Sequence, residues 1–501
     1  MNMAAVVPAD HGRSARAAPL WRRQPTAREA LLLGLFCALV SALPVLVAPL
    51  PQMGDYPAHV ARWRVMLDLG HDPWLARYYA FKWRWSGNLG FDLLIRPLAP
   101  LLGLENAGRV LVALLAPLTG FGVLSVEWVL RRRIGVGSLL ALAFIWSPAL
   151  LMGFVNFCLS LAVALLAFAL WVRTEDKPWR QLLFLPIGLI VWLCHVSGWG
   201  ILGILCFGYE LHQRRNVFSA ALACVPLALP LAPMLLGGGT KGQLSYGLFV
   251  SLYKQAIWTR AMRDEVFLLD SLSLALVIIL LGAALLTKRM DGRLGWAALI
   301  LLVGSFVVPR KIFGGDYADY RLIASGLMVA CMAVDWRAPR WALWLAPALY
   351  LGRLAVTTIG WADHAHEAKE LLGALDHLPQ GAKVANVVVM ERRKWSFDRM
   401  DHLAAYAVVR KSALTNVNFA VPTIHMLQVR EGGPRFIDPS QRMFHSRGQK
   451  IDLSAFPPSA DADWLWYIGD QPPDKLPTGA QVVWRAPHGL LARLANGAGR
   501  V

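Results

Sequence analysis

The stretch ALLLGLFCALVSALPVLVAPL, residues 30–50, runs without a charged side chain into the polar segment PQMGDYPAH, residues 51–59. About 20 consecutive apolar residues suffice for one helix to cross the hydrocarbon core of a bilayer. Pro49, Pro51 and Pro57 then end that helix and force the chain to turn. The sequence therefore predicts a membrane span that carries Asp55 to the boundary between lipid and water.

The composition of the whole chain is typical of a protein with many membrane spans. Of its 501 residues, 56% are hydrophobic and 16% are charged, and the mean hydropathy is +0.46. Arginines precede the first apolar stretch, and no small-residue cleavage site follows it. We therefore expect a retained anchor and not a removed signal peptide.

The net charge of +18 does not predict a nucleic-acid partner, because Lys and Arg flank the apolar stretches and do not gather on one soluble segment. Such flanking is typical of the cytoplasmic ends of spans and of contact with anionic membrane lipids. All six cysteines lie in apolar stretches, which predicts neither disulfides nor a cysteine metal site.

Apolar length and the positions of Lys and Arg together predict about eleven membrane-spanning helices. They are expected at residues 30–50, 107–130, 136–151, 154–172, 182–194, 198–211, 217–236, 266–286, 294–308, 322–334 and 341–359. With a cytoplasmic N-terminus, every basic cluster beside these spans falls on the cytoplasmic side: residues 131–133, 214–215, 288–289, 293, 337 and 340.

This arrangement predicts three parts of the chain. Residues 1–29 form a basic cytoplasmic segment, residues 30–359 a transmembrane domain, and residues 360–501 a small α/β domain outside. The outer loop 51–106 is too long for a simple connection, and its segments 55–69 and 89–102 are expected to be helices lying along the membrane surface. After residue 359 we expect helices at 361–375 and 398–409, and strands at 382–390, 413–419, 464–468, 481–485 and 490–494.

Asp55 is the strongest candidate for a catalytic group. A carboxylate at the membrane boundary can reach a substrate whose reactive end is polar and whose tail lies in lipid. His59 follows at i+4, on the same helix face, where the pair could share a proton, a substrate hydroxyl or a divalent metal. No third metal ligand is evident from the spacing, so a metal is not indicated. The structural alternative is that Asp55 only caps the helix that Pro57 opens.

The outer loop 309–321, PRKIFGGDYADYR, is the second informative stretch. Arg310, Lys311 and Arg321 are cations on the side where spans usually avoid them, which points to an anionic ligand such as a phosphate. The alternative is that Asp316 and Asp319 neutralise these cations, or that they reach lipid phosphates.

Arg62, Tyr320 and His195 complete the candidate site, as further residues that could bind the substrate or its phosphate. Arg62 and Arg64 follow Asp55 closely, and we expect their charges to hold the pKa of its carboxyl low. His195 lies at another outward turn, where a polar residue serves either a site or a helix cap.

With these residues in view, the chain resembles the GT-C class of integral-membrane glycosyltransferases, which use lipid-linked sugar donors. The resemblance rests on an acid early in a large first outer loop (Gly54-Asp55-Tyr56-Pro57), on many spans, on an outer basic loop ending in Asp319-Tyr320-Arg321, and on a C-terminal outer domain. This chain has a single acid where some relatives have an acidic pair, so metal dependence and a protein acceptor stay open.

The resemblance implies an inverting transfer. The compact loops and the many Ala, Leu and Arg residues favour a bacterial inner membrane, with the C-terminal domain in the periplasm. Asp55 would deprotonate the hydroxyl of a glycan, lipid or protein acceptor, which attacks the anomeric carbon of a polyprenyl-phosphate sugar, and Arg310, Lys311 and Arg321 would hold the phosphate. Two alternatives stay open: a polysaccharide polymerase or O-antigen-ligase type of enzyme, and a transporter or scaffold without enzymatic activity.

Overall fold

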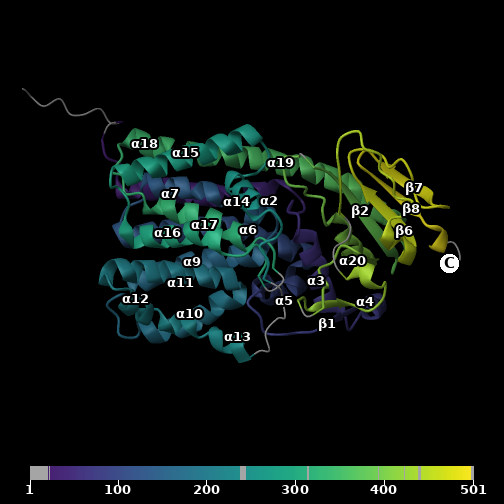
Figure 1. The fold of residues 1–501 in the computed structure, drawn as a ribbon, viewed down its shortest axis with the longest axis horizontal. Helices are drawn as coiled ribbons and strands as arrows, with labels where there is room; N and C mark the ends of the chain where they lie inside the picture. The colour runs from purple at the N-terminus through teal and green to yellow at the C-terminus, as the bar shows by residue number, and fades with distance from the viewer. Residues whose placement is uncertain are drawn as a thin grey trace, which may run out of the picture.

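The computed structural model describes residues 21, 23–236, 244–312, 315–392, 394–422, 424–437 and 442–497. Most of the predicted basic segment 1–29 lies outside these residues. A long helical bundle carries a small sheet domain at one end, and Figure 1 shows α19 running from the bundle to the sheet.

The bundle is built from helices of very different lengths. Its elements are α1 (Ala27–Val40), α2 (Leu43–Val47), α6 (Leu104–Arg131), α7 (Val136–Ala141), η2 (Leu142–Phe144), α8 (Pro148–Leu151), α9 (Val155–Arg173), α10 (Arg180–Cys194), α11 (Val196–Arg214), α12 (Val217–Ala223), η3 (Val225–Ala228), α13 (Leu231–Leu236), α14 (Val250–Thr259), α15 (Phe267–Leu286), α16 (Gly292–Val307), α17 (Ala318–Ala333), α18 (Arg340–Leu345) and α19 (Ala348–Leu372).

Among the described residues, five helices are long and apolar enough to cross a membrane: Ala27–Val47, Leu104–Arg131, Val155–Arg173, Phe267–Leu286 and Arg340–His377. The bent pair Val217–Ala223 and Val225–Met234 would make a sixth, and three shorter apolar helices lie beside them. The outward face of α15 supports a lipid environment, because Leu268, Ile279 and Leu286 are 64%, 66% and 87% exposed. The predicted number of eleven spans stays a prediction.

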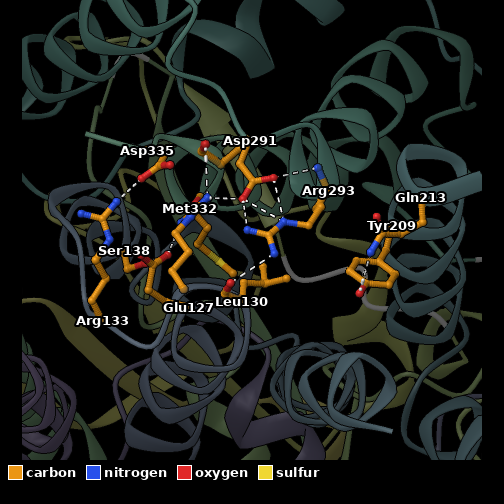
Figure 2. Close-up of polar contacts among 12 residues, drawn as sticks. Glu127, Leu130, Arg133, Ser138, Tyr209, Gln213, Asp291, Arg293, Met332 and Asp335 are labelled. Carbon is orange, nitrogen blue, oxygen red and sulfur yellow. Dashed lines mark hydrogen bonds and ion pairs between the residues drawn. The ribbon is translucent and has the colours of Figure 1, made fainter. Parts of the chain in front are cut away.

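One end of the bundle collects the basic clusters, and we call it the basic end. Arg131, at the end of α6, contacts the Met332 carbonyl at the end of α17 and the Asp291 carboxylate before α16. Arg293 donates to the Leu130 carbonyl (3.1 Å), as Figure 2 shows. The basic ends of these helices therefore lie together, as expected if one face of the membrane holds them all.

Asp55 lies at the opposite end, which we call the Asp55 end. Here α3 (Tyr56–Asp68), α4 (Pro73–Tyr78) and α5 (Gly90–Leu102) form the first loop. The loop segment 55–69 was expected to lie along the membrane surface on its apolar face. In the structure that face meets protein: Tyr56, Val60 and Trp63 are at most 1% exposed, because α3 packs between α6 and the C-terminal domain. In α5, by contrast, Leu93, Leu94 and Leu101 face outward.

The C-terminal domain is a mixed sheet of β2 (Lys383–Glu391), β3 (Leu414–Thr415), β5 (Arg442–His445), β6 (Trp464–Ile468), β7 (Gln481–Ala486) and β8 (Gly489–Arg493), with α20 (Tyr406–Lys411) and short 3-10 turns such as η5 (Leu403–Ala405) beside it. The strand order is β3-β2-β6-β8-β7, and β5 also pairs with β2. The central strand β2 is buried over most of its length, which matches its valine-rich run and its parallel neighbours.

Two features join this domain to the membrane bundle more closely than the sequence indicates. The strand β1 (Tyr79–Phe81) of the first loop pairs with β4 (Leu427–Val429) of the C-terminal domain. The predicted boundary at residues 359 and 360 falls inside α19, which continues to Leu372. The first loop and the C-terminal domain therefore share one folded layer at the Asp55 end.

Candidate active site

The loop that carries Asp55 is fixed against the turn between α8 and α9. The Asp55 backbone N–H donates to the Met152 carbonyl (2.9 Å). Gly153 has a φ of +92°, and a Cβ there would meet the backbone nitrogens of Asp55 and Tyr56 at 3.0 Å. Only glycine fits this close approach without a shift, so the turn sets the position of Asp55.

The Asp55 side chain does not serve as a helix cap. The residue occupies the N-cap position of α3, but its carboxylate accepts no capping hydrogen bond. The side chain is 20% exposed. Burial raises the pKa of Asp55 to about 6, against the opposing positive charges of Arg442 and Arg321. A carboxyl of this kind is a stronger base than an ordinary aspartate.

The expectation that Arg62 and Arg64 hold this pKa low is wrong, because each has another carboxylate partner. Arg62 pairs with buried Asp92 (2.5 Å), and Arg64 pairs with Asp68 and Asp72. Both cations are thereby engaged in the first loop.

Arg321 lies in the first turn of α17 and is only 9% exposed. Its guanidinium lies 4.4 Å from the ring centre of Phe154 and 5.7 Å from that of Phe157. None of the described carboxylates lies within ion-pair distance of it, and its Nε has no hydrogen-bond partner among those residues. Because Phe154 directly follows Gly153, one turn brings the two candidates Asp55 and Arg321 together.

Arg310 is held differently, although it comes from the same loop. It makes a two-pronged ion pair with Asp316 (2.7 and 2.8 Å) and lies over the rings of Tyr253 and Tyr317. Asp316 therefore neutralises Arg310, as the alternative for this loop proposed. Asp319 pairs with Lys254 (2.6 Å) and so leaves Arg321 unneutralised.

The other two candidates of this stretch lie apart from Asp55 in their contacts. Lys311 exchanges backbone hydrogen bonds with Ser245, and its side chain is exposed. The Tyr320 hydroxyl donates to the Arg260 carbonyl (2.5 Å) and ties α17 to the end of α14.

His59 and His195 are both in the neighbourhood, but each has a structural contact. The His59 ring stacks on Trp63 at 6.1 Å, and burial lowers its pKa to about 3, so it is neutral. The His195 Nδ1 accepts from the Ser197 backbone N–H (3.0 Å) and caps α11. Its ring meets Phe157 edge-on, on which Arg321 also packs.

Sequence reasoning missed two residues near Asp55. His402 comes from the C-terminal domain, and its Nε2 lies 3.7 Å from Asp55 Oδ1. Arg442, on β5, acts on the Asp55 carboxylate through its charge and pairs with Asp401 (2.6 Å). No local pattern marks either residue, because the tertiary fold alone brings them to the first loop.

A metal is not assigned to this site. In the described part of the chain, one group of side chains has metal-ligand atoms within 4.8 Å of one another: Glu367, Asp470 and His488. This group lies on α19 and beside the sheet, and Asp55 is not part of it. The side chains of Asp55 and Arg321 themselves offer acid–base and electrostatic chemistry.

Neither a protein-family model nor a curated protein matches this chain. Among solved structures, the chain is similar to the crystal structure of ArnT from Cupriavidus metallidurans bound to undecaprenyl phosphate. The two share 14% identity, the match covers 95% of this chain and 100% of that chain, and the TM-score is 0.48.

Proposed function

We propose that this protein is a membrane glycosyltransferase of the GT-C type, which moves a sugar from a polyprenyl-phosphate donor to an acceptor hydroxyl. The observation that supports it is the pair formed by Asp55 and Arg321. A partly buried carboxylate without a capping bond and a buried guanidinium without a carboxylate partner among the described residues meet at one turn, at the end of an apolar bundle.

The reaction divides its charges between these two groups. Asp55 takes the proton of the acceptor hydroxyl while that oxygen attacks the anomeric carbon. The bond from this carbon to the phosphate oxygen breaks, and the phosphate leaves with the electron pair. Arg321 stabilises the negative charge that grows on the phosphate. A single displacement of this kind inverts the anomeric configuration.

The position of the site suits a substrate with a long apolar tail. The polyprenyl chain would lie along the apolar outer faces of the bundle while the phosphate and sugar reach the Asp55 end. We place this end on the outer side of the membrane, because the basic clusters lie at the opposite end and such clusters favour the cytoplasm. In a bacterial inner membrane the C-terminal domain would then be periplasmic.

The test is binding and turnover of a radiolabelled mixture of polyprenyl-phosphate sugars by purified protein. We expect wild type and Asp55→Asn to bind donor equally, with turnover by wild type only. Asp72→Asn is the matched control, since Asp72 belongs to the same loop but caps α4 and pairs with Arg64. Full turnover by Asp55→Asn would contradict the assignment of Asp55 as the general base. Failure of both proteins to bind the mixture would contradict a polyprenyl-phosphate sugar as the donor.

A further inference from the structure

His402 is a buried histidine whose free nitrogen faces the proposed base. The residue has no exposed surface, and its Nε2 lies 3.7 Å from Asp55 Oδ1. Within the described parts of the chain, this Nε2 has no hydrogen-bond partner. A buried, unpaired ring nitrogen costs free energy unless another state of the protein uses it.

The contact of the other ring nitrogen, Nδ1, shows which nitrogen of His402 carries the proton. Its Nδ1 lies 2.7 Å from the Val417 carbonyl oxygen. A carbonyl oxygen can only accept, so Nδ1 carries the proton and donates it to this bond. Burial lowers the pKa of His402 to about 4, and the ring is therefore neutral near pH 7. The Nε2 facing Asp55 is consequently a lone pair and an acceptor.

The segment that carries His402 is anchored to the membrane bundle. Arg399 donates to the Gln52 carbonyl (2.8 Å), three residues before Asp55, and also pairs with Asp264 (3.1 Å). Its side chain is fully buried. These contacts hold the C-terminal segment at a fixed position beside the Asp55 loop.

We propose that His402 is a positioning residue for the base, whose Nε2 accepts a hydrogen bond from the O–H that Asp55 gains when it deprotonates the acceptor. This inference rests on the proposed function of Asp55. The C-terminal domain would then complete the active site, and it would not be a docking module alone.

The proton that leaves the acceptor moves to Asp55, and His402 accepts a hydrogen bond from it there. Before transfer, Asp55 is a carboxylate and its Oδ1 and the lone pair of Nε2 do not bond, which agrees with the separation of 3.7 Å. The acceptor O–H bond breaks, an O–H bond forms on Asp55, and the short movement that closes the gap creates an O–H to Nε2 hydrogen bond. This bond stabilises only the protonated state, so it increases the proton affinity of Asp55.

Other groups also face this pair. Arg321 from α17 and Arg442 from β5 favour the ionised carboxylate. His59, one turn along α3, interacts with His402 and is neutral. The proton that Asp55 takes from the acceptor stays on Asp55 and does not move to His402. Burial raises the pKa of Asp55 to about 6 and lowers that of His402 to about 4.

The test measures protonation of Asp55 without any substrate. A hydrophobic carbodiimide labels protonated carboxyls, and mass spectrometry of the peptide with Asp55 gives the labelling midpoint over a series of pH values. His402→Asn keeps an N–H for Val417 but lacks the distal acceptor. We expect its midpoint to fall by about one pH unit, and kcat/KM above the midpoint to fall about tenfold because the base is weaker.

Two variants separate this role from a structural one. His402→Gln reaches Asp55 with an amide oxygen and should restore part of the midpoint shift. His425→Asn is the control, since His425 packs on the same Phe419 ring as His402 and should leave the midpoint unchanged. His402→Leu, without a polar atom, gives a second test should the asparagine variant not fold, with the same downward shift expected.

An unmoved midpoint in both His402→Asn and His402→Leu would overturn the inference. That outcome differs from a failure of the proposed function, which would show as full turnover by Asp55→Asn or as no donor binding by wild type. The labelling experiment needs neither donor nor acceptor.

Discussion

The two ends of the bundle treat buried charge in opposite ways. At the basic end, Arg131 is 5% exposed and lies between the carboxylates of Glu127 and Asp291, and Ser138 donates to Glu127 (2.8 Å; Figure 2). At the Asp55 end, Asp55 and Arg321 are left without an opposite charge at ion-pair distance among the described residues.

We interpret the paired charges of the basic end as structural and the unpaired charges of the Asp55 end as functional. Paired charges at the basic end close the helix ends and leave nothing for a ligand to satisfy. An unpaired buried charge destabilises the protein on its own, so it persists where a substrate or a reaction uses it. The comparison therefore predicts opposite consequences for removing a carboxylate at each end.

The largest expected effect is on the rate of Asp55→Asn. Loss of a general base reduces kcat by roughly 10²- to 10⁴-fold. The thermal midpoint in detergent should stay the same or rise. The folded pKa of Asp55 lies above its unfolded value of 3.8, so ionising this group costs stability as pH rises from about 4 to about 6, and asparagine removes that cost. A lower thermal midpoint with an unchanged kcat in Asp55→Asn would contradict this, because Asp55 would then have a structural role and not a catalytic one.

Asp291→Asn should show the converse. It removes the partner of Arg131 (3.0 Å) and of Arg293 (2.7 Å) at a side chain only 9% exposed. We expect a loss on the order of 3 kcal/mol in stability, seen as a lower thermal midpoint, with kcat per folded molecule unchanged. An intact thermal midpoint would show that the basic end does not depend on this pairing.

Arg321 and Arg310 provide a comparison within the Asp55 end. Arg321→Gln removes the unpaired guanidinium and should weaken donor binding by about tenfold or more, because a charge-assisted bond to phosphate is lost. Arg310→Gln removes a cation that Asp316 already neutralises, and donor binding should change less than about threefold. Filter binding of the radiolabelled donor measures both, and equal losses would contradict the assignment of Arg321.

Local patterns predicted much of this architecture from the sequence. The expected strand 464–468 agrees with β6, and the expected span 154–172 differs from α9 by one residue at each end. Both elements are continuous apolar runs, whose signal needs no distant partner. Asp55 and Arg321 stood out as candidates in the same way, because a carboxylate after a span and a cation on the predicted outer side are local departures from the membrane pattern.

What the sequence did not reveal depends on contacts between distant segments. The pairing of β1 with β4, the burial of α3 and the approach of His402 to Asp55 all arise where the C-terminal domain closes over the first loop. The pKa of Asp55 was misjudged for the same reason. Arg62 lies close to Asp55 in sequence, but its charge is neutralised by an ion pair with Asp92. Burial is then the largest influence on the pKa of Asp55.

The smallest effect is expected at Lys311, the remaining predicted phosphate ligand. Its side chain is exposed and makes no ion pair among the described residues, whereas its backbone is paired with Ser245. An exposed, solvated ammonium contributes roughly 0.5 kcal/mol or less to a nearby anion. Lys311→Gln should therefore change donor affinity by about twofold at most, and raising the salt concentration should remove even that difference. A tenfold loss would mean that the donor phosphate reaches outward to this loop, and the buried Arg321 would then share its role.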